Sequence, residues 1–230
     1  MPSLSPLEWE ALGLSLRVAG WSVVTSLPFG LAIAWVLARR DFFGKGLLDG
    51  IVHLPLVLPP VVVGYLLLLL LGRNGPLGRL LMDWFGVGLP FTWQGAALAA
   101  AIMAFPLMVR AMRLSLEGVD RRLEAAARTL GAPPLAVFAT ITLPLMAPGI
   151  LVGALLGFAR SLGEFGATIT FAANIPGETR TLPLALYSLT QTPGGEGPAL
   201  RLTVLSIGLS LVALGASELV ARRLRARIGG

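Results

Sequence analysis

One stretch of the chain decides its fold, residues 121–145, which read RRLEAAARTLGAPPLAVFATITLPL. It lies between two long uncharged runs, Trp84–Val109 and Thr129–Ala159, the second of which overlaps its end. Its first half is charged and rich in alanine, which favours a helix. Gly131 ends that helix, and Pro133-Pro134 prevents it from continuing. We therefore predict a helix, a break and a short second helix at a membrane surface, where the chain turns back into the bilayer.

The composition indicates an integral membrane protein. Hydrophobic residues make up 55% of the 230 residues, charged residues only 13%, and the mean hydropathy is +0.81. Soluble domains carry about a quarter charged residues. The pI near 11.2 would suit a nucleic-acid-binding protein, but the basic residues gather at the ends of apolar runs, where membrane topology explains them. We therefore expect a lipid environment and no nucleic-acid partner.

The chain lacks the residues of several kinds of catalytic and cofactor site. It has no cysteine and one histidine, His53, which excludes disulfides, Fe–S clusters and histidine-based metal sites. We expect His53 to be a packed or interfacial residue rather than a ligand. No phosphate-binding loop of the form G-x-x-x-x-G-K-[ST] is present, nor a convincing Ser-His-Asp set. We therefore predict no catalytic site, no metal and no cofactor.

The apolar runs predict an all-α protein with five transmembrane helices in a single domain, residues 1–230, with a core of about 11–220. Three prolines in the second span predict kinks and a packed position inside the bundle. A short helix is expected at Leu77–Phe85, and the segment Ala173–Ala199 is expected to be a loop. The spans cover about 12–38, 50–72, 92–110, 144–172 and 200–220, with a coupling loop at 111–143.

Charge asymmetry orients these spans. Twelve of the 18 basic residues fall on the side that holds residues 121–145, four fall on the other side, and Arg17 and Arg160 lie within spans. The more positive side of a membrane protein faces the cytoplasm. The N-terminus is therefore predicted to be outside, and the C-terminus and residues 121–145 to be cytoplasmic. Because the N-terminus has no basic start, the first span is expected to be retained rather than cleaved as a signal peptide.

The spacing within residues 121–145 resembles the EAA loop of binding-protein-dependent ABC importer permeases. That loop reads Glu-Ala-Ala, three residues, Gly, nine residues, Ile, one residue, Leu-Pro. When the two are aligned on Gly131, the family's glutamate falls on Ala125, and Glu124 sits one place early. The resemblance implies the type I importer fold. It also implies an ATPase-coupling role for eight residues: Glu124, Ala125, Ala126, Ala127, Gly131, Ile141, Leu143 and Pro144.

Other stretches are similar to the molybdate permease subunit within that family. They are GEFGATITFAANIPGETRTLPLALY (Gly163–Tyr187), HLPLVLPPVVVGYLLL, FPLMVRAMRLSLEGVD and QTPGGE. The GEFG core is shared with sulfate and tungstate permeases, so these oxyanions remain alternatives. The longer NIPGETRT at Asn174–Thr181 favours molybdate.

The resemblance implies an importer in the plasma membrane of a prokaryote. In it, two copies of the chain form the pathway, two cytoplasmic ATP-binding subunits drive it, and an external protein delivers the oxyanion. Two other classes compete with this interpretation. An intramembrane enzyme should show paired acids or histidines within its spans, and a stand-alone secondary transporter usually shows internal repeats, which are not evident here.

Arg160 and Glu164 form the one pair of opposite charges inside a predicted span. Their i,i+4 spacing places them on one helix face. Arg160 would attract a dianion on the transport pathway, with Glu164 tuning that attraction. The pair would equally serve as a self-neutralising structural contact near the outer interface. The sequence leaves both readings open.

Overall fold

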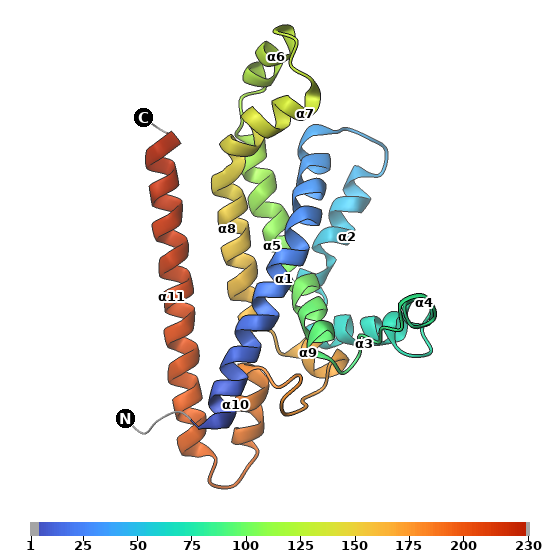
Figure 1. Ribbon diagram of the computed structural model, residues 1–230, viewed down its shortest axis with the longest axis vertical. Coiled ribbons are helices and arrows are strands. Elements are labelled where there is room, and N and C mark those ends of the chain that lie inside the picture. The colour runs from blue at the N-terminus through green and yellow to red at the C-terminus, as the bar shows by residue number, and fades with distance from the viewer. Residues whose placement is uncertain (1–4, 229–230) are drawn as a thin grey trace.

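The computed structural model describes residues 5–228, and the described part of the chain is helical throughout its regular structure (Figure 1). The first half holds α1 (Pro6–Arg39), α2 (Lys45–Val57), α3 (Pro60–Leu71), α4 (Pro76–Phe85) and α5 (Trp93–Glu117). The second half holds α6 (Arg121–Thr129), α7 (Pro134–Val137), the π-helix η1 (Phe138–Thr142), α8 (Leu143–Leu162), α9 (Gly166–Phe171), α10 (Leu182–Thr190) and α11 (Glu196–Ile228).

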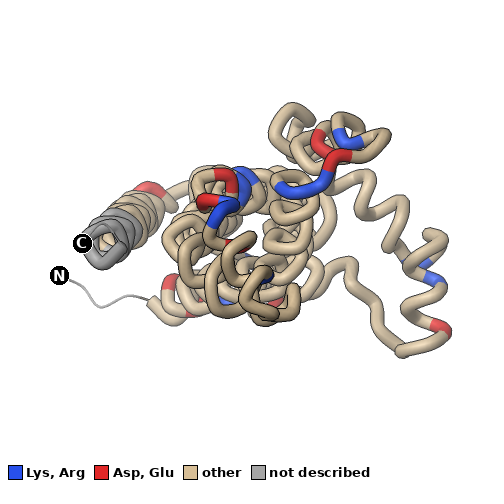
Figure 2. Tube along the Cα trace, turned by 90° about the horizontal axis from the view of Figure 1, so that it is seen from above, with Lys and Arg blue, Asp and Glu red and all other residues tan. Residues whose placement is uncertain are grey.

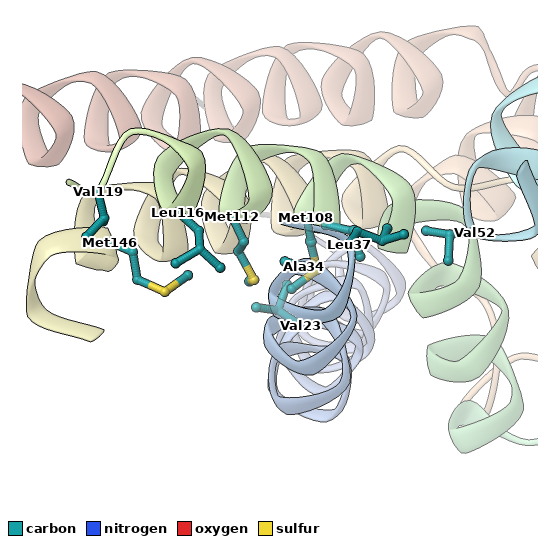
Figure 3. Packing of buried hydrophobic residues seen from close by; sticks show 10 residues of the cluster. Val23, Ala34, Leu37, Val52, Met108, Met112, Leu116, Val119 and Met146 are labelled. Atoms are coloured by element: carbon teal, nitrogen blue, oxygen red, sulfur yellow. The ribbon is translucent and has the colours of Figure 1, made fainter. Parts of the chain in front are cut away.

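Three helices, α1, α5 and α8, form the centre of the bundle, and α5 packs extensively against both of the others. Figure 3 shows the buried side chains between them, with Met108, Met112 and Leu116 along α5. Val23, Ala34 and Leu37 of α1 and Met146 of α8 complete the core.

Small residues allow α8 to approach its neighbours closely. A Cβ added to Gly149 would overlap the Ser115 side chain of α5, and one added to Gly153 would lie 3.1 Å from the Met108 carbonyl oxygen. On the α1 side, the buried Ser22 hydroxyl donates to the Ser161 hydroxyl at 2.7 Å. In membrane proteins such small-residue faces replace the hydrophobic effect as the basis of helix association.

The second predicted span differs from its expected form. It is not one kinked helix but two, α2 and α3, bent by 115° at Leu58-Pro59. Both residues at the bend are extended because each precedes a proline, and Pro60 starts α3, where no backbone donor is needed. As Figure 1 shows, α3 and α4 project sideways from the bundle.

Four helices of the described chain are long and apolar enough to cross a membrane, and the bent pair α2–α3 makes a fifth if it counts as one span. The four correspond to the first, third, fourth and fifth predicted spans. Several boundaries differ from expectation: α1 already begins at Pro6, and α11 extends from Glu196 to Ile228. Helix α5 continues to Glu117, the fourth span breaks at Gly163–Phe165 before α9, and the expected loop at 173–199 contains α10. The short helix expected at Leu77–Phe85 is confirmed as α4.

The two ends of the bundle differ. One end carries α6 and α7 together with the C-terminal ends of α1 and α11, and the other carries the start of α1 and α10 (Figure 1). Viewed from the α6 end in Figure 2, basic and acidic residues lie side by side over the central helices. Ion pairs therefore concentrate at the end that holds residues 121–145.

Candidate functional site

Residues 121–145 fold as predicted, as a helix, a break and a second helix. The side chain of Asp120 caps α6 by accepting the Arg122 amide at 2.9 Å, while Glu124 in the first turn and Arg128 in the last complement the helix dipole. The chain leaves the helix at Leu130, and Gly131 has a φ of +87°. A side chain at 131 would be strained there, which accounts for glycine.

Beyond the break, the chain returns to the bundle as one continuous helical segment with a π-helical turn inside it. Pro134 begins α7, the five residues of η1 follow, and α8 starts at Leu143 with Pro144 in its first turn. Ile141 and Leu143 are half-buried and Pro144 is exposed. The π-helical turn ends at Thr142, whose side chain is buried at the junction with α8. π-Helical turns are often found at functional sites.

Glu124 is the one residue of α6 that is buried. Its Oε1 accepts a hydrogen bond from Arg39 Nη2 of α1 at 2.9 Å and another from Thr142 Oγ1 at 2.8 Å. The Arg39 and Glu124 side chains are only 9% and 11% exposed. Arg39 Nη2 also donates to the Val119 carbonyl at 3.5 Å, and Arg121 Nη2 of α6 donates to the Ala38 carbonyl at 3.2 Å. These contacts join α6 to the ends of α1 and α8.

The outward face of the same segment is apolar and basic. Leu130 and Leu135 are 88% and 78% exposed, and Leu123 is half-exposed. Of the predicted alanines, Ala125 and Ala126 are exposed and Ala127 is half-buried, so they add only small side chains to this face of the helix. A cavity of about 450 Å³ opens beside this face. Its walls include Trp35, Glu124, Arg128, Pro134, Leu135 and Phe138.

A second group of charges lies beside the segment, between α2 and α5. Arg113 donates to Glu117 at 2.8 Å and to Asp49 at 3.1 Å. The Arg113 guanidinium therefore pairs with one carboxylate of its own helix and with one of α2. His53 Nδ1 lies 2.9 Å from the Asp49 carbonyl of its own helix. No cluster of metal-binding side chains was found in the described part of the chain.

The Arg160–Glu164 pair lies at the far end of α8. Arg160 Nη1 and Glu164 Oε2 are 2.6 Å apart, and the Glu164 side chain is only 2% exposed, against 28% for Arg160. The other oxygen of Glu164 accepts the Ala167 amide at 2.9 Å, so the carboxylate also holds the start of α9. Helix α8 has 20 residues. At 1.5 Å per residue, roughly 30 Å separates Arg160 from the Glu124 contacts.

Residues 26–226 match the family described as "Binding-protein-dependent transport system inner membrane component". The chain belongs to this family. It is also 62% identical over 226 residues to the protein named "Molybdenum transport system permease protein ModB" of Escherichia coli strain K12, covering 98% of this chain and 99% of that one. The protein of that name in Haemophilus influenzae is 57% identical over 223 residues, which is 97% of each chain.

Solved structures of ABC transporters share the fold. A bacterial ABC transporter that imports the polysaccharide alginate superposes with a TM-score of 0.75 at 18% identity, covering 96% of this chain and 80% of that one. The MetNI methionine ABC transporter gives a TM-score of 0.65 at 16% identity, covering 94% of each chain. The resemblance to binding-protein-dependent importer permeases and the expected type I fold are therefore confirmed. The orientation of the termini stays a prediction.

The structure brings only part of the predicted site together. Glu124 and the end of η1 meet. Arg160 and Glu164 also pair, but not on one helix face as predicted, because α8 ends at Leu162 and Glu164 lies in the break before α9. Sequence reasoning missed Arg39 and Thr142, because Arg39 looked like an ordinary basic residue at the end of a span. No local pattern marks either residue, because only the fold shows that Glu124 lies on the face of α6 that turns toward the bundle.

We expect Glu124→Gln to loosen α6, because it leaves the Arg39 guanidinium buried without its counter-charge. Removing one partner of a buried ion pair typically costs about 3–5 kcal/mol. Hydrogen–deuterium exchange of the purified chain in detergent should show faster amide exchange across residues 121–142. The control is Asp41→Asn, because Asp41 contacts Lys45 at the same 2.9 Å but is exposed. Equal exchange in the two variants would contradict the assignment.

Proposed function

We propose that this chain is the transmembrane permease subunit of an ATP-driven importer for molybdate. The observation that carries the proposal is the 62% identity, over almost the whole length of both chains, to a protein named as a molybdenum transport permease. The absence of a P-loop in the sequence fits a subunit whose ATP is bound by a partner. The chain accordingly supplies the pathway and the mechanical contact, and has no catalytic site of its own.

The mechanical contact is the segment from α6 to the start of α8. Its exposed leucines and its basic residues present an apolar, positively charged surface to cytoplasmic ATP-binding subunits. The twelve-to-four charge asymmetry supports a cytoplasmic position for this end and for the C-terminus, with the N-terminus outside. The membrane is then the plasma membrane of a prokaryote.

Two copies of the chain form the pathway. One chain, with four long helices and the bent α2–α3 pair, is too small to enclose a transport pathway alone. A two-fold symmetric dimer can form such a pathway between its subunits. An external protein delivers the oxyanion. One structural relative of this chain is an alginate importer in complex with a substrate-bound periplasmic protein. The permease itself does not require a tight molybdate site, because tight binding along the transport pathway would slow the release of molybdate.

Permeation of sulfate or tungstate is the second candidate. A protein named "Probable sulfate transport system permease protein cysT" from Helicosporidium is 39% identical over 171 residues, or 74% of this chain and 63% of that one. Molybdate is preferred because the molybdenum-named relatives are more similar and cover more of the chain.

The test is uptake of radiolabelled molybdate by vesicles that contain the assembled importer, with unlabelled tungstate and sulfate as competitors. We expect ATP-dependent uptake that excess sulfate does not suppress. Leu130→Asp should abolish uptake and detach the ATP-binding subunits, because it places a charge at the most exposed apolar residue of the docking face. Phe43→Asp, a fully exposed site outside the segment, is the control. Suppression of molybdate uptake by excess sulfate would favour the second candidate, and intact uptake by Leu130→Asp would contradict the docking face.

Arg160 is proposed to lie on the oxyanion path. It is partly exposed and stands at the far end of α8, while Glu164 is buried and also holds α9. Arg160→Gln should therefore lower molybdate uptake several-fold while the assembly still forms. Glu164→Gln should instead reduce the amount of folded protein recovered by size-exclusion chromatography. If Arg160→Gln reduces recovery and uptake in equal measure, the pair is structural only.

A further inference from the structure

A second cavity, of about 270 Å³, lies at the end of the molecule opposite α6. It is bounded by the start of α1, by α10 and by the start of α11, which Figure 1 shows together at the bottom of the bundle. Two arginines and one carboxylate contribute to its walls alongside hydroxyl and apolar side chains. The residues that matter here are Glu8, Arg180, Ser188, Leu189, Arg201 and Leu202.

The charges in this cavity do not cancel. Arg201 Nε donates to the buried carboxylate of Glu8 at 2.9 Å, which neutralises that pair. The sequence neighbour of Arg180 is Glu178, but Glu178 Oε1 instead accepts the Trp93 amide at 3.3 Å. No carboxylate among the described side chains forms an ion pair with Arg180. Two cations and one anion therefore leave the cavity with a net positive charge.

Neutral groups fix Arg180 in place. Its Nε donates to Asn174 Oδ1 at 3.0 Å. The amide nitrogen of Asn174 donates in turn to the Ser188 hydroxyl at 2.7 Å and lies 3.4 Å from the Leu184 carbonyl, both on α10. An arginine held through Nε keeps its two Nη groups for another acceptor, and this planar fork matches two oxygens of a tetrahedral oxyanion.

We infer that this cavity binds a tetrahedral anionic oxo group of the phosphate class, with Arg180 as its main ligand and Arg201 beside it. The anion would balance the net positive charge of the cavity. It would bind to an Arg180 side chain that Asn174 already holds in place. Two sources supply this chemistry, the phosphate of a membrane lipid and a free oxyanion.

The surroundings favour the lipid phosphate. Leu189 and Leu202 form apolar walls next to the two arginines. Along α11 beyond the cavity, Leu200, Val204 and Leu211 are 67%, 62% and 64% exposed. A lipid whose phosphate sits on Arg180 would lay its acyl chains along this helix. The cavity also lies at the ends of the long helices, which is the depth of the headgroup region in a bilayer.

The experiment is native mass spectrometry of the purified chain in detergent, titrated in one arm with phosphatidylglycerol and in the other with inorganic phosphate. We expect the wild type to retain phosphatidylglycerol and Arg180→Gln to bind it about tenfold more weakly, which is the loss of one charge-assisted contact. Arg180→Lys should be intermediate, because it keeps the charge and loses the fork. Arg79→Gln, an exposed arginine of α4 outside the cavity, should bind as the wild type does.

The two arms distinguish the sources. If Arg180→Gln loses phosphatidylglycerol and Arg79→Gln does not, the ligand is the phosphate of a lipid. Binding of inorganic phosphate with the same dependence on Arg180, and no such dependence for lipid, supports the free oxyanion. Equal binding of both probes by the wild type, Arg180→Gln and Arg79→Gln would overturn the site. So would an Arg180→Gln variant that binds both probes normally and loses only its affinity for the external binding protein.

Discussion

The buried ion pair between Arg39 and Glu124 is the contact on which the α6 end of the molecule depends. Two charges that are about 10% exposed are stable only while they satisfy each other. Helix α6 has a single buried residue, so its attachment to the bundle rests mainly on this pair and on Thr142, with a further hydrogen bond from the exposed Arg121 to the Ala38 carbonyl. If α6 is the proposed docking segment, a displacement of α6 would be passed through these contacts to the end of α1 and the start of α8.

Helix α8 carries that contact across the membrane. It begins directly after Thr142 and ends just past Arg160, and the glycines at 149 and 153 bring it against α5 with no room for an added side chain. Close packing of this kind leaves few voids between α8 and α5. The docking segment and the proposed oxyanion path thus lie at the two ends of one element.

Local features could be predicted from the sequence, and long-range pairings could not. Gly131 and the prolines after it predicted the break after α6, and the i,i+4 spacing predicted the Arg160–Glu164 pair. The pairs Arg39–Glu124 and Glu8–Arg201 join residues 85 and 193 positions apart, and no local pattern marks them. Similarly, the three prolines of the second span indicated a distortion, but its size, 115°, depends on how α3 packs on α9.

The most direct test is charge reversal at the ion pair in the complete importer, reading the ATP hydrolysed per molybdate transported. Arg39→Glu and Glu124→Arg should each raise that ratio while the ATP-binding subunits remain attached, because the exposed side chains proposed for docking, Leu130 and Leu135, are kept. The double variant should bring the ratio back toward the wild-type value, since it restores an attractive pair between α1 and α6. Wild-type ratios in both single variants would contradict the account, as would a double variant no better coupled than either single one.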